Sequence, residues 1–96
     1  MPYKILISRR ATVSLEEILD YTLSNFGNTV RNKLLDKIEK TIYTVSIHPL
    51  LFSEIKPTIH RVLIINEISM FYQVKEKTIR ILLFWNNRQN PKQLKL

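Results

Sequence analysis

The chain of 96 residues contains no cysteine, a single glycine and no long apolar run, and each shortage excludes a class of protein. Without cysteine there is no disulfide framework, thiol nucleophile or thiolate zinc site, which fits a reducing compartment. One glycine cannot supply a phosphate-binding glycine loop. No segment approaches the ~20 apolar residues of a membrane span, and the N-terminus does not have the form of a signal peptide. We therefore expect a soluble, cytoplasmic protein without a cofactor or membrane partner.

Hydrophobic residues make up 45% of the chain, which predicts an ordered core in one domain covering residues 1–96. The net charge of +7 is uneven, because residues 58–96 carry seven basic and two acidic side chains. Such a basic half could face nucleic acid or an acidic protein. The two histidines, His48 and His60, are twelve residues apart with no acidic cluster nearby, so no metal site is predicted.

Two amphipathic helices are predicted in the first half, separated by Gly27. Both show apolar residues at spacings of three and four, and their stripes contain Ala11, Leu15, Ile18, Leu19, Thr22 and Phe26 in the first helix, and Val30, Leu34, Ile38, Thr41, Ile42 and Val45 in the second. Ser8, or Ser14 with Glu17, could cap the first helix. Gly27 is expected to be a left-handed C-terminal residue, with Asn28 capping the next helix and His48-Pro49 ending it. The short connection predicts an antiparallel hairpin.

The remaining segments are predicted to be strands. Tyr3 to Ser8 forms a short first strand, and IHRVLII, ISMFYQV and TIRILLFW form a three-stranded antiparallel meander, because only two or three residues separate them. The predicted fold class is thus α+β: an N-terminal strand, a helix hairpin and a meander packed on the hairpin. Even alternation along the last strand predicts Ile79, Ile81, Leu83 and Trp85 on one face, and Arg80, Leu82 and Phe84 on the other.

After this strand the sequence NNRQN places five hydrogen-bonding side chains in a row, Asn86 to Asn90, before Pro91. Asparagines followed by proline are typical of a turn. A cluster of amides around an arginine is also typical of a binding site, since a guanidinium offers five donors suited to phosphate or carboxylate. Both interpretations of Arg88 remain open at this point.

The order of elements, with DYTLSNFG at the helix junction, ISMFYQV and TIRILLF in the meander and FWNNRQNP at its end, resembles the RelE/ParE superfamily of toxins from bacterial type II toxin–antitoxin systems. The resemblance extends over essentially the whole chain and is nearest to the ParE-like, plasmid-stabilisation type. It implies a growth-inhibiting toxin that a cognate antitoxin wraps and neutralises, in a hetero-oligomer of toxin and antitoxin. It also implies a functional surface at or beside the end of the last strand.

Members of the superfamily either cut messenger RNA on the ribosome or inhibit DNA gyrase, and a fold does not choose between these targets. The resemblance places the basic residues of cutting members on positions that are here Ser69, Val62 and His60, and no histidine or tyrosine follows Trp85. The candidate catalytic residues that remain are His60, Arg61, Arg80 and Arg88. His60 could be a general base, although an isolated strand histidine is more often a surface or pairing residue.

A gyrase inhibitor needs a binding surface and no proton shuttle. The candidate target-binding residues are Lys56, Arg61, Arg80, Trp85, Asn87 and Arg88. We therefore favour ParE-like action on gyrase. A metal-independent, RelE-like endoribonuclease is the alternative, and a non-toxic relative that only binds an antitoxin is a further one, so the sequence leaves open whether the protein is an enzyme.

Overall fold

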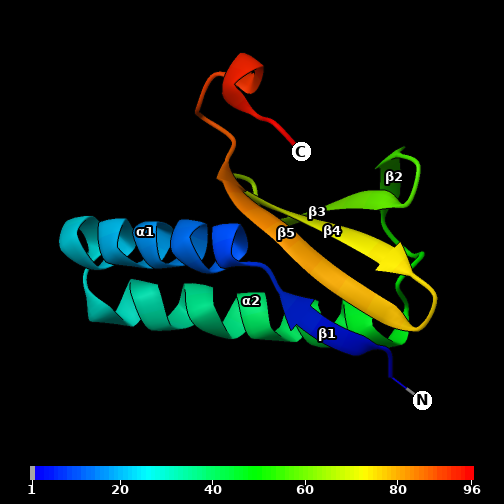
Figure 1. The fold of residues 1–96 in the computed structure, drawn as a ribbon. Helices are drawn as coiled ribbons and strands as arrows, with labels where there is room; N and C mark the ends of the chain where they lie inside the picture. Colours follow the sequence, from blue (N-terminus) through cyan, green and yellow to red (C-terminus); the bar gives the residue numbers. More distant parts are fainter. Residues whose placement is uncertain (1) are drawn as a thin grey trace.

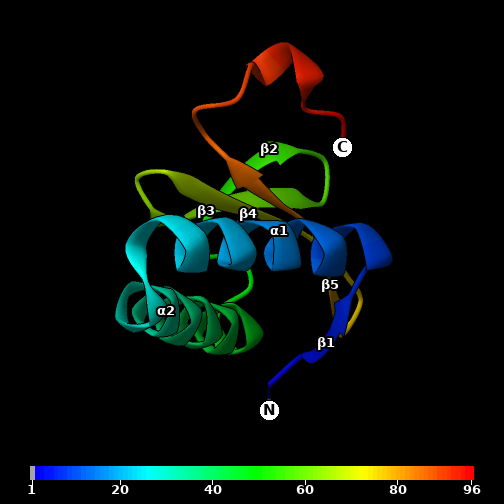
Figure 2. The same ribbon diagram turned by 90° about the vertical axis from the view of Figure 1, so that its left-hand side faces the viewer.

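Two helices cover one face of a five-stranded sheet in the computed structural model, which describes residues 2–96 (Figure 1). The elements in chain order are β1 (Lys4–Ile7), α1 (Arg9–Phe26), α2 (Asn28–Ile47), β2 (Ser53–Lys56), β3 (Ile59–Ile65), β4 (Ile68–Lys75), β5 (Thr78–Asn86) and the short 3₁₀ helix η1 (Pro91–Gln93). The C-terminal segment rises on the side of the sheet away from the helices (Figure 2). The predicted α+β class, with the meander packed on a helix hairpin, is confirmed.

The ends of the helices follow from local hydrogen bonding. Ser8, not Ser14, caps α1, because its hydroxyl accepts a bond of 3.0 Å from the Ala11 N–H. Gly27 joins the two helices directly with φ 89° and ψ 176°. Its φ is positive as predicted, but its ψ is extended and lies outside the left-handed helical region. The prediction that Asn28 caps α2 is wrong, because Asn28 is the first helical residue and Gly27 occupies the capping position.

The sheet has the order β1-β5-β4-β3-β2. β3, β4 and β5 form the predicted antiparallel meander, and β1 pairs with β5 in parallel, with Ile5 opposite Ile79. The edge strand β2 was not predicted. All four of its residues are exposed, so it lacks the alternation of polar and apolar residues that indicates a strand.

A β-bulge at Leu82 changes the faces of β5. Tyr72 pairs with Ile81 and its neighbour Phe71 pairs with Leu83, so Leu82 has no partner in the register. The even alternation predicted from the sequence is therefore wrong beyond Ile81. Phe84 joins Ile79 and Ile81 in the core beneath the helices, whereas Leu83 and Trp85 share the opposite face with Arg80.

The main core lies between the helices and the sheet, and its members are Ala11, Leu19, Leu34, Ile38, Val45, Val62, Ile64, Ile68, Met70, Tyr72, Ile79, Ile81 and Phe84. Phe26, which was assigned to the apolar stripe of the first helix, is 61% exposed, because it lies at the last position of α1 beyond the packed turns. Phe71 and Leu83 are also buried, but their register places them on the other face of the sheet. The Arg10 guanidinium donates to the Lys95 carbonyl and so ties the C-terminal segment to the start of α1.

Candidate functional surface

The amide-rich segment after β5 contains two turns, and they account for two of its asparagines. The Asn86 side chain accepts a bond of 2.9 Å from the Arg88 N–H, and the Asn90 side chain accepts one of 3.0 Å from the Lys92 N–H at the start of η1. Side-chain oxygens of asparagine commonly accept from the backbone two residues on. Asn86 and Asn90 therefore shape the backbone, as the turn interpretation predicts.

Asn87 lies in a different environment, in a polar network that joins β3, β4 and the turn after β5. Its side-chain oxygen accepts from the Ser69 hydroxyl at 2.8 Å and from Arg61 Nη2 at 3.3 Å. Arg61 Nε donates to the same hydroxyl at 2.9 Å, and the Asn87 side-chain nitrogen donates to the Asn66 carbonyl at 3.0 Å. The network restrains the guanidinium of Arg61 at the end of the sheet, on the face away from the helices.

The side chain of Arg61 is exposed and keeps Nη1 available for a further partner. Within residues 2–96 the one ion pair joins Lys40 to Asp36, so no carboxylate of the described chain neutralises Arg61. Ser69 and Asn87 hold it through neutral groups. A restrained, uncompensated guanidinium of this kind is suited to bind a phosphate or a carboxylate.

Trp85 belongs to the same surface. It pairs in register with Ser69 and is half-buried, so its ring lies on the side of the sheet that carries Arg61. The even alternation of the sequence placed Trp85 on the same face as Ile81. The bulge at Leu82 removes that argument, since it turns the two side chains to opposite faces.

The other predicted target-binding residues are spread more widely. Arg80 is exposed and shares the face of Arg61, but it pairs with Gln73 toward the opposite end of the sheet. Lys56 is exposed on the edge strand β2, opposite Ile59. The structure therefore brings together Arg61, Trp85 and Asn87, and leaves Lys56 and Arg80 at separate places.

His60 faces the helices and is 3% exposed. Its Nδ1 lies 2.9 Å from the Phe52 carbonyl oxygen, and its ring stacks on Tyr72 with centroids 5.1 Å apart. Burial and this stacking remove His60 from the surface that a substrate could reach. His60 is therefore a pairing residue, because it contacts the Phe52 carbonyl and the ring of Tyr72.

Tyr72 is also buried, and its hydroxyl donates to the Pro49 carbonyl at 2.8 Å. Burial raises the pKa of Tyr72 to about 12, because desolvation disfavours the phenolate. The hydroxyl therefore stays protonated at neutral pH.

Arg88 is exposed and lines a large groove of about 1240 Å³ between α1 and the ends of β3, β4 and β5. Apolar side chains dominate this α1 groove, and those left exposed on its helical walls include Val13, Tyr21, Phe26 and Val30. Arg9, Arg10 and Arg88 supply positive charge, and Glu17 and Glu67 supply negative charge. The groove is suited to an amphipathic segment of another protein.

Sequence reasoning missed Ser69 as a partner of Arg61 and missed the α1 groove altogether. A small polar residue inside the apolar run ISMFYQV was the one local signal for Ser69. Val13 and Tyr21 recur at a spacing of eight outside the predicted stripe of α1, which is compatible with a second apolar face.

Among residues 2–96, no group of three His, Asp or Glu side chains could hold a metal ion, and no helix is long and apolar enough to cross a membrane.

Comparison with family models gives a match over residues 5–91 to the ParE toxin of the type II toxin–antitoxin system parDE. The chain belongs to the ParE toxin family. Among curated protein sequences, none matches this chain. The match covers both long helices and all five strands apart from Lys4, the first residue of β1, so the family assignment agrees with the fold resemblance inferred from the sequence.

Solved structures of toxins share the fold. A chain of the chromosomal ParDE toxin–antitoxin system from P. aeruginosa has a TM-score of 0.74 and 18% identity, over 88% of this chain and 95% of that one. The isolated E. coli RelE toxin has a TM-score of 0.62 and 18% identity, over 94% and 89%. The YoeB dimer from Staphylococcus aureus gives 0.59 and 18%, over 86% and 94%. At these identities the similarity concerns the fold and leaves the target undetermined.

Proposed function

We propose that this ParE-family toxin inhibits DNA gyrase through the sheet surface formed by Arg61, Trp85 and Asn87, and that a cognate antitoxin neutralises it. The observation that carries the proposal is the environment of Arg61. Its partners, Ser69 and Asn87, are neutral hydrogen-bonding groups and do not exchange protons at neutral pH. Such a surface can bind an anion but lacks a general base.

Cleavage of RNA by its own 2′-hydroxyl needs a base and an acid beside the scissile phosphate. His60 was the one imidazole among the candidate catalytic residues, and its side chain is buried and faces the helices. Arg80 and Arg88 carry guanidinium groups, which donate hydrogen bonds and have no acceptor atom for a proton. This distribution supports a binding function over a RelE-like endoribonuclease, which stays the alternative.

The antitoxin is proposed to occupy the α1 groove. Exposed Val13, Tyr21 and Phe26 offer an apolar lining, and Arg9, Arg10 and Arg88 offer sites for acidic residues. An amphipathic segment with its apolar side toward α1 would bury this lining. The complex would then be a hetero-oligomer of toxin and antitoxin.

Two assays on the purified toxin, run in parallel, test the choice of target. One follows supercoiling of relaxed plasmid by DNA gyrase, and the other follows cleavage of messenger RNA on translating ribosomes. Inhibition of supercoiling without cleavage supports the proposal. Cleavage without inhibition favours the endoribonuclease, and inactivity in both assays favours a non-toxic relative that only binds an antitoxin.

A further inference from the structure

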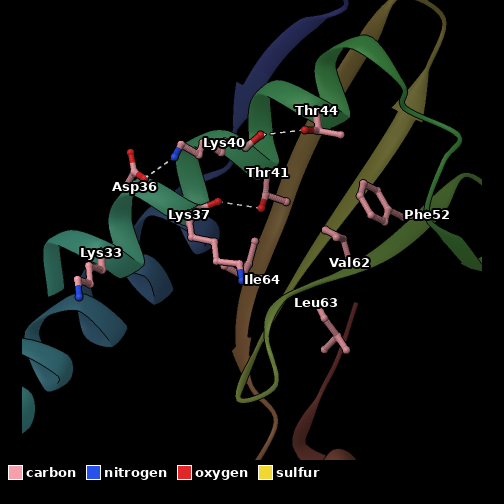
Figure 3. A pocket seen from close by; sticks show the side chains of 10 residues that line it. All are labelled: Lys33, Asp36, Lys37, Lys40, Thr41, Thr44, Phe52, Val62, Leu63 and Ile64. Atoms are coloured by element: carbon pink, nitrogen blue, oxygen red, sulfur yellow. Dashed lines mark hydrogen bonds and ion pairs between the residues drawn. The ribbon is translucent and has the colours of Figure 1, made fainter. Parts of the chain in front are cut away.

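A second groove lies between α2 and β3 and shares no lining residue with the α1 groove (Figure 3). Its volume is about 470 Å³. The helix provides one wall, and Phe52 with Val62 and Ile64 provides the other. Phe52 is only partly covered, whereas Val62 and Ile64 are buried, so the groove reaches the edge of the core.

The wall formed by α2 is less polar than its sequence indicates. The Thr41 hydroxyl donates to the Lys37 carbonyl at 2.8 Å, and the Thr44 hydroxyl donates to the Lys40 carbonyl at 3.1 Å. Both hydroxyls are therefore satisfied within the helix and need no external partner. A ligand can rest against the remaining carbon atoms of these threonines without leaving a hydroxyl unpaired.

Three lysines, Lys33, Lys37 and Lys40, form the rim of the groove on α2. Lys40 is paired with Asp36 at 3.0 Å, and this is the one ion pair among residues 2–96. The rim therefore carries two uncompensated positive charges, at Lys33 and Lys37. One turn of helix separates them, or about 6 Å along the axis. Long lysine stems can also cover apolar surface while their ammonium groups stay in water.

We propose that this α2–β3 groove is a docking site for an acidic amphipathic segment of a partner protein. Apolar side chains of the segment would pack on the partly covered Phe52 and on Leu63, a lining residue that is 52% exposed. Two carboxylates one turn apart would pair with Lys33 and Lys37. The positive charges of Lys33 and Lys37 favour an acidic segment as the occupant. A second copy of the chain is a poor candidate, because each copy carries a net charge of +7. The proposal does not depend on gyrase being the target of the toxin.

The probe is a synthetic fluorescein-labelled helical peptide of about three turns, with two glutamates four residues apart next to a stripe of leucines. Two control peptides replace the glutamates by glutamine or the leucines by serine. Binding to the full chain is followed by fluorescence anisotropy at 150 mM salt, and the site is mapped by amide chemical shifts.

Two doubly substituted proteins separate the groove from general electrostatics. Lys33→Glu with Lys37→Glu inverts the rim, and Lys75→Glu with Lys92→Glu makes the same change in net charge at exposed positions elsewhere. We expect the first pair to weaken peptide binding at least tenfold and the second less than threefold, with unchanged melting temperatures. Shifts should centre on α2 and β3, and both control peptides should bind at least tenfold more weakly.

Several results would overturn the proposal. These are equal losses in the two double variants, undiminished binding of the serine peptide, shifts centred on the α1 groove, and no binding up to millimolar peptide. Vesicles containing phosphatidylglycerol and sedimentation velocity are run alongside. Binding of vesicles but not peptide, or a dimer that the rim substitutions dissociate, would assign the groove to lipid or to a second copy instead.

Discussion

At the junction of the two helices, Gly27 adopts a backbone conformation that residues with a side chain rarely occupy. Its φ is 89° with ψ 176°, and an added Cβ would meet no atom within 4 Å. Strain at this position is therefore a property of the backbone and not of crowding. We predict that Gly27→Ala and Gly27→Val each lower the free energy of unfolding by roughly 1–3 kcal/mol. Urea denaturation measures both losses, and parent-like stability in either variant would contradict this account.

Tyr72 makes the stability of the folded protein depend on pH in the alkaline range. Burial raises its pKa to about 12 from the ordinary tyrosine value of 10.0. The folded state therefore binds the phenolic proton more tightly than the unfolded state, so the resulting stability is complete below pH ~10 and falls as pH rises toward 12. Melting temperatures from pH 8 to 11.5 should decline more steeply in the parent than in Tyr72→Phe. Parallel curves would show that Tyr72 does not titrate in this way.

Arg88 and Asn87 are neighbours with different expected roles. The Arg88 side chain is exposed, and only its backbone N–H bonds to Asn86, so Arg88→Ala should leave the melting temperature unchanged. Asn87→Ala removes the acceptor of the buried Ser69 hydroxyl and should cost about 1–2 kcal/mol. Thermal unfolding of the two variants distinguishes these roles. A large loss in Arg88→Ala alone would mean that its side chain braces the turn.

At the scale of the elements, α1 presents Val13 and Tyr21 to the groove proposed for the antitoxin. Both side chains are exposed, so replacing them with glutamate should reduce antitoxin affinity by at least tenfold and change stability little. Ser24→Glu introduces the same charge at an exposed position of α1 outside the groove lining. Isothermal titration with the cognate antitoxin measures the difference. Equal affinities in all variants would place the antitoxin elsewhere.

The helices and the meander could be predicted because their signals are local. The spacing of apolar residues, the short connections and Gly27 can each be recognised within a short stretch of sequence. The structure has the helices and the meander where the sequence predicted them. The parallel pairing of β1 with β5 joins residues more than seventy positions apart, and no local pattern encodes it. β2 is exposed throughout, so it carries no burial signal.

The candidate surface was predicted only in part, because its geometry depends on a bulge and on side-chain partners. Alternation in TIRILLFW is regular, and nothing in those letters indicates that Leu82 falls out of register. Trp85 was therefore assigned to the wrong face. Ser69 and His60 were both recognised as positions of interest, but only the fold shows that one holds Arg61 and the other lies under the helices.

At the scale of the whole molecule, a family toxin made without its antitoxin should slow bacterial growth. The Arg61 surface, with its uncompensated charge, and the open α1 groove are both exposed regions that a partner would cover. Induction of the chain alone should therefore reduce the growth rate, and coexpression with the cognate antitoxin should restore it. Normal growth at a verified level of soluble protein would favour the non-toxic relative.

Gyrase inhibition by variants of the Arg61 surface tests the central proposal most directly. Supercoiling of relaxed plasmid is titrated with the parent toxin, with Arg61→Ala and with Lys75→Ala, an exposed control at the last position of β4. The expected result is that the parent and Lys75→Ala inhibit equally, whereas Arg61→Ala needs at least tenfold more protein while it keeps its helical circular dichroism spectrum. Equal inhibition by all three proteins, or no inhibition by the parent at any concentration, would contradict the account.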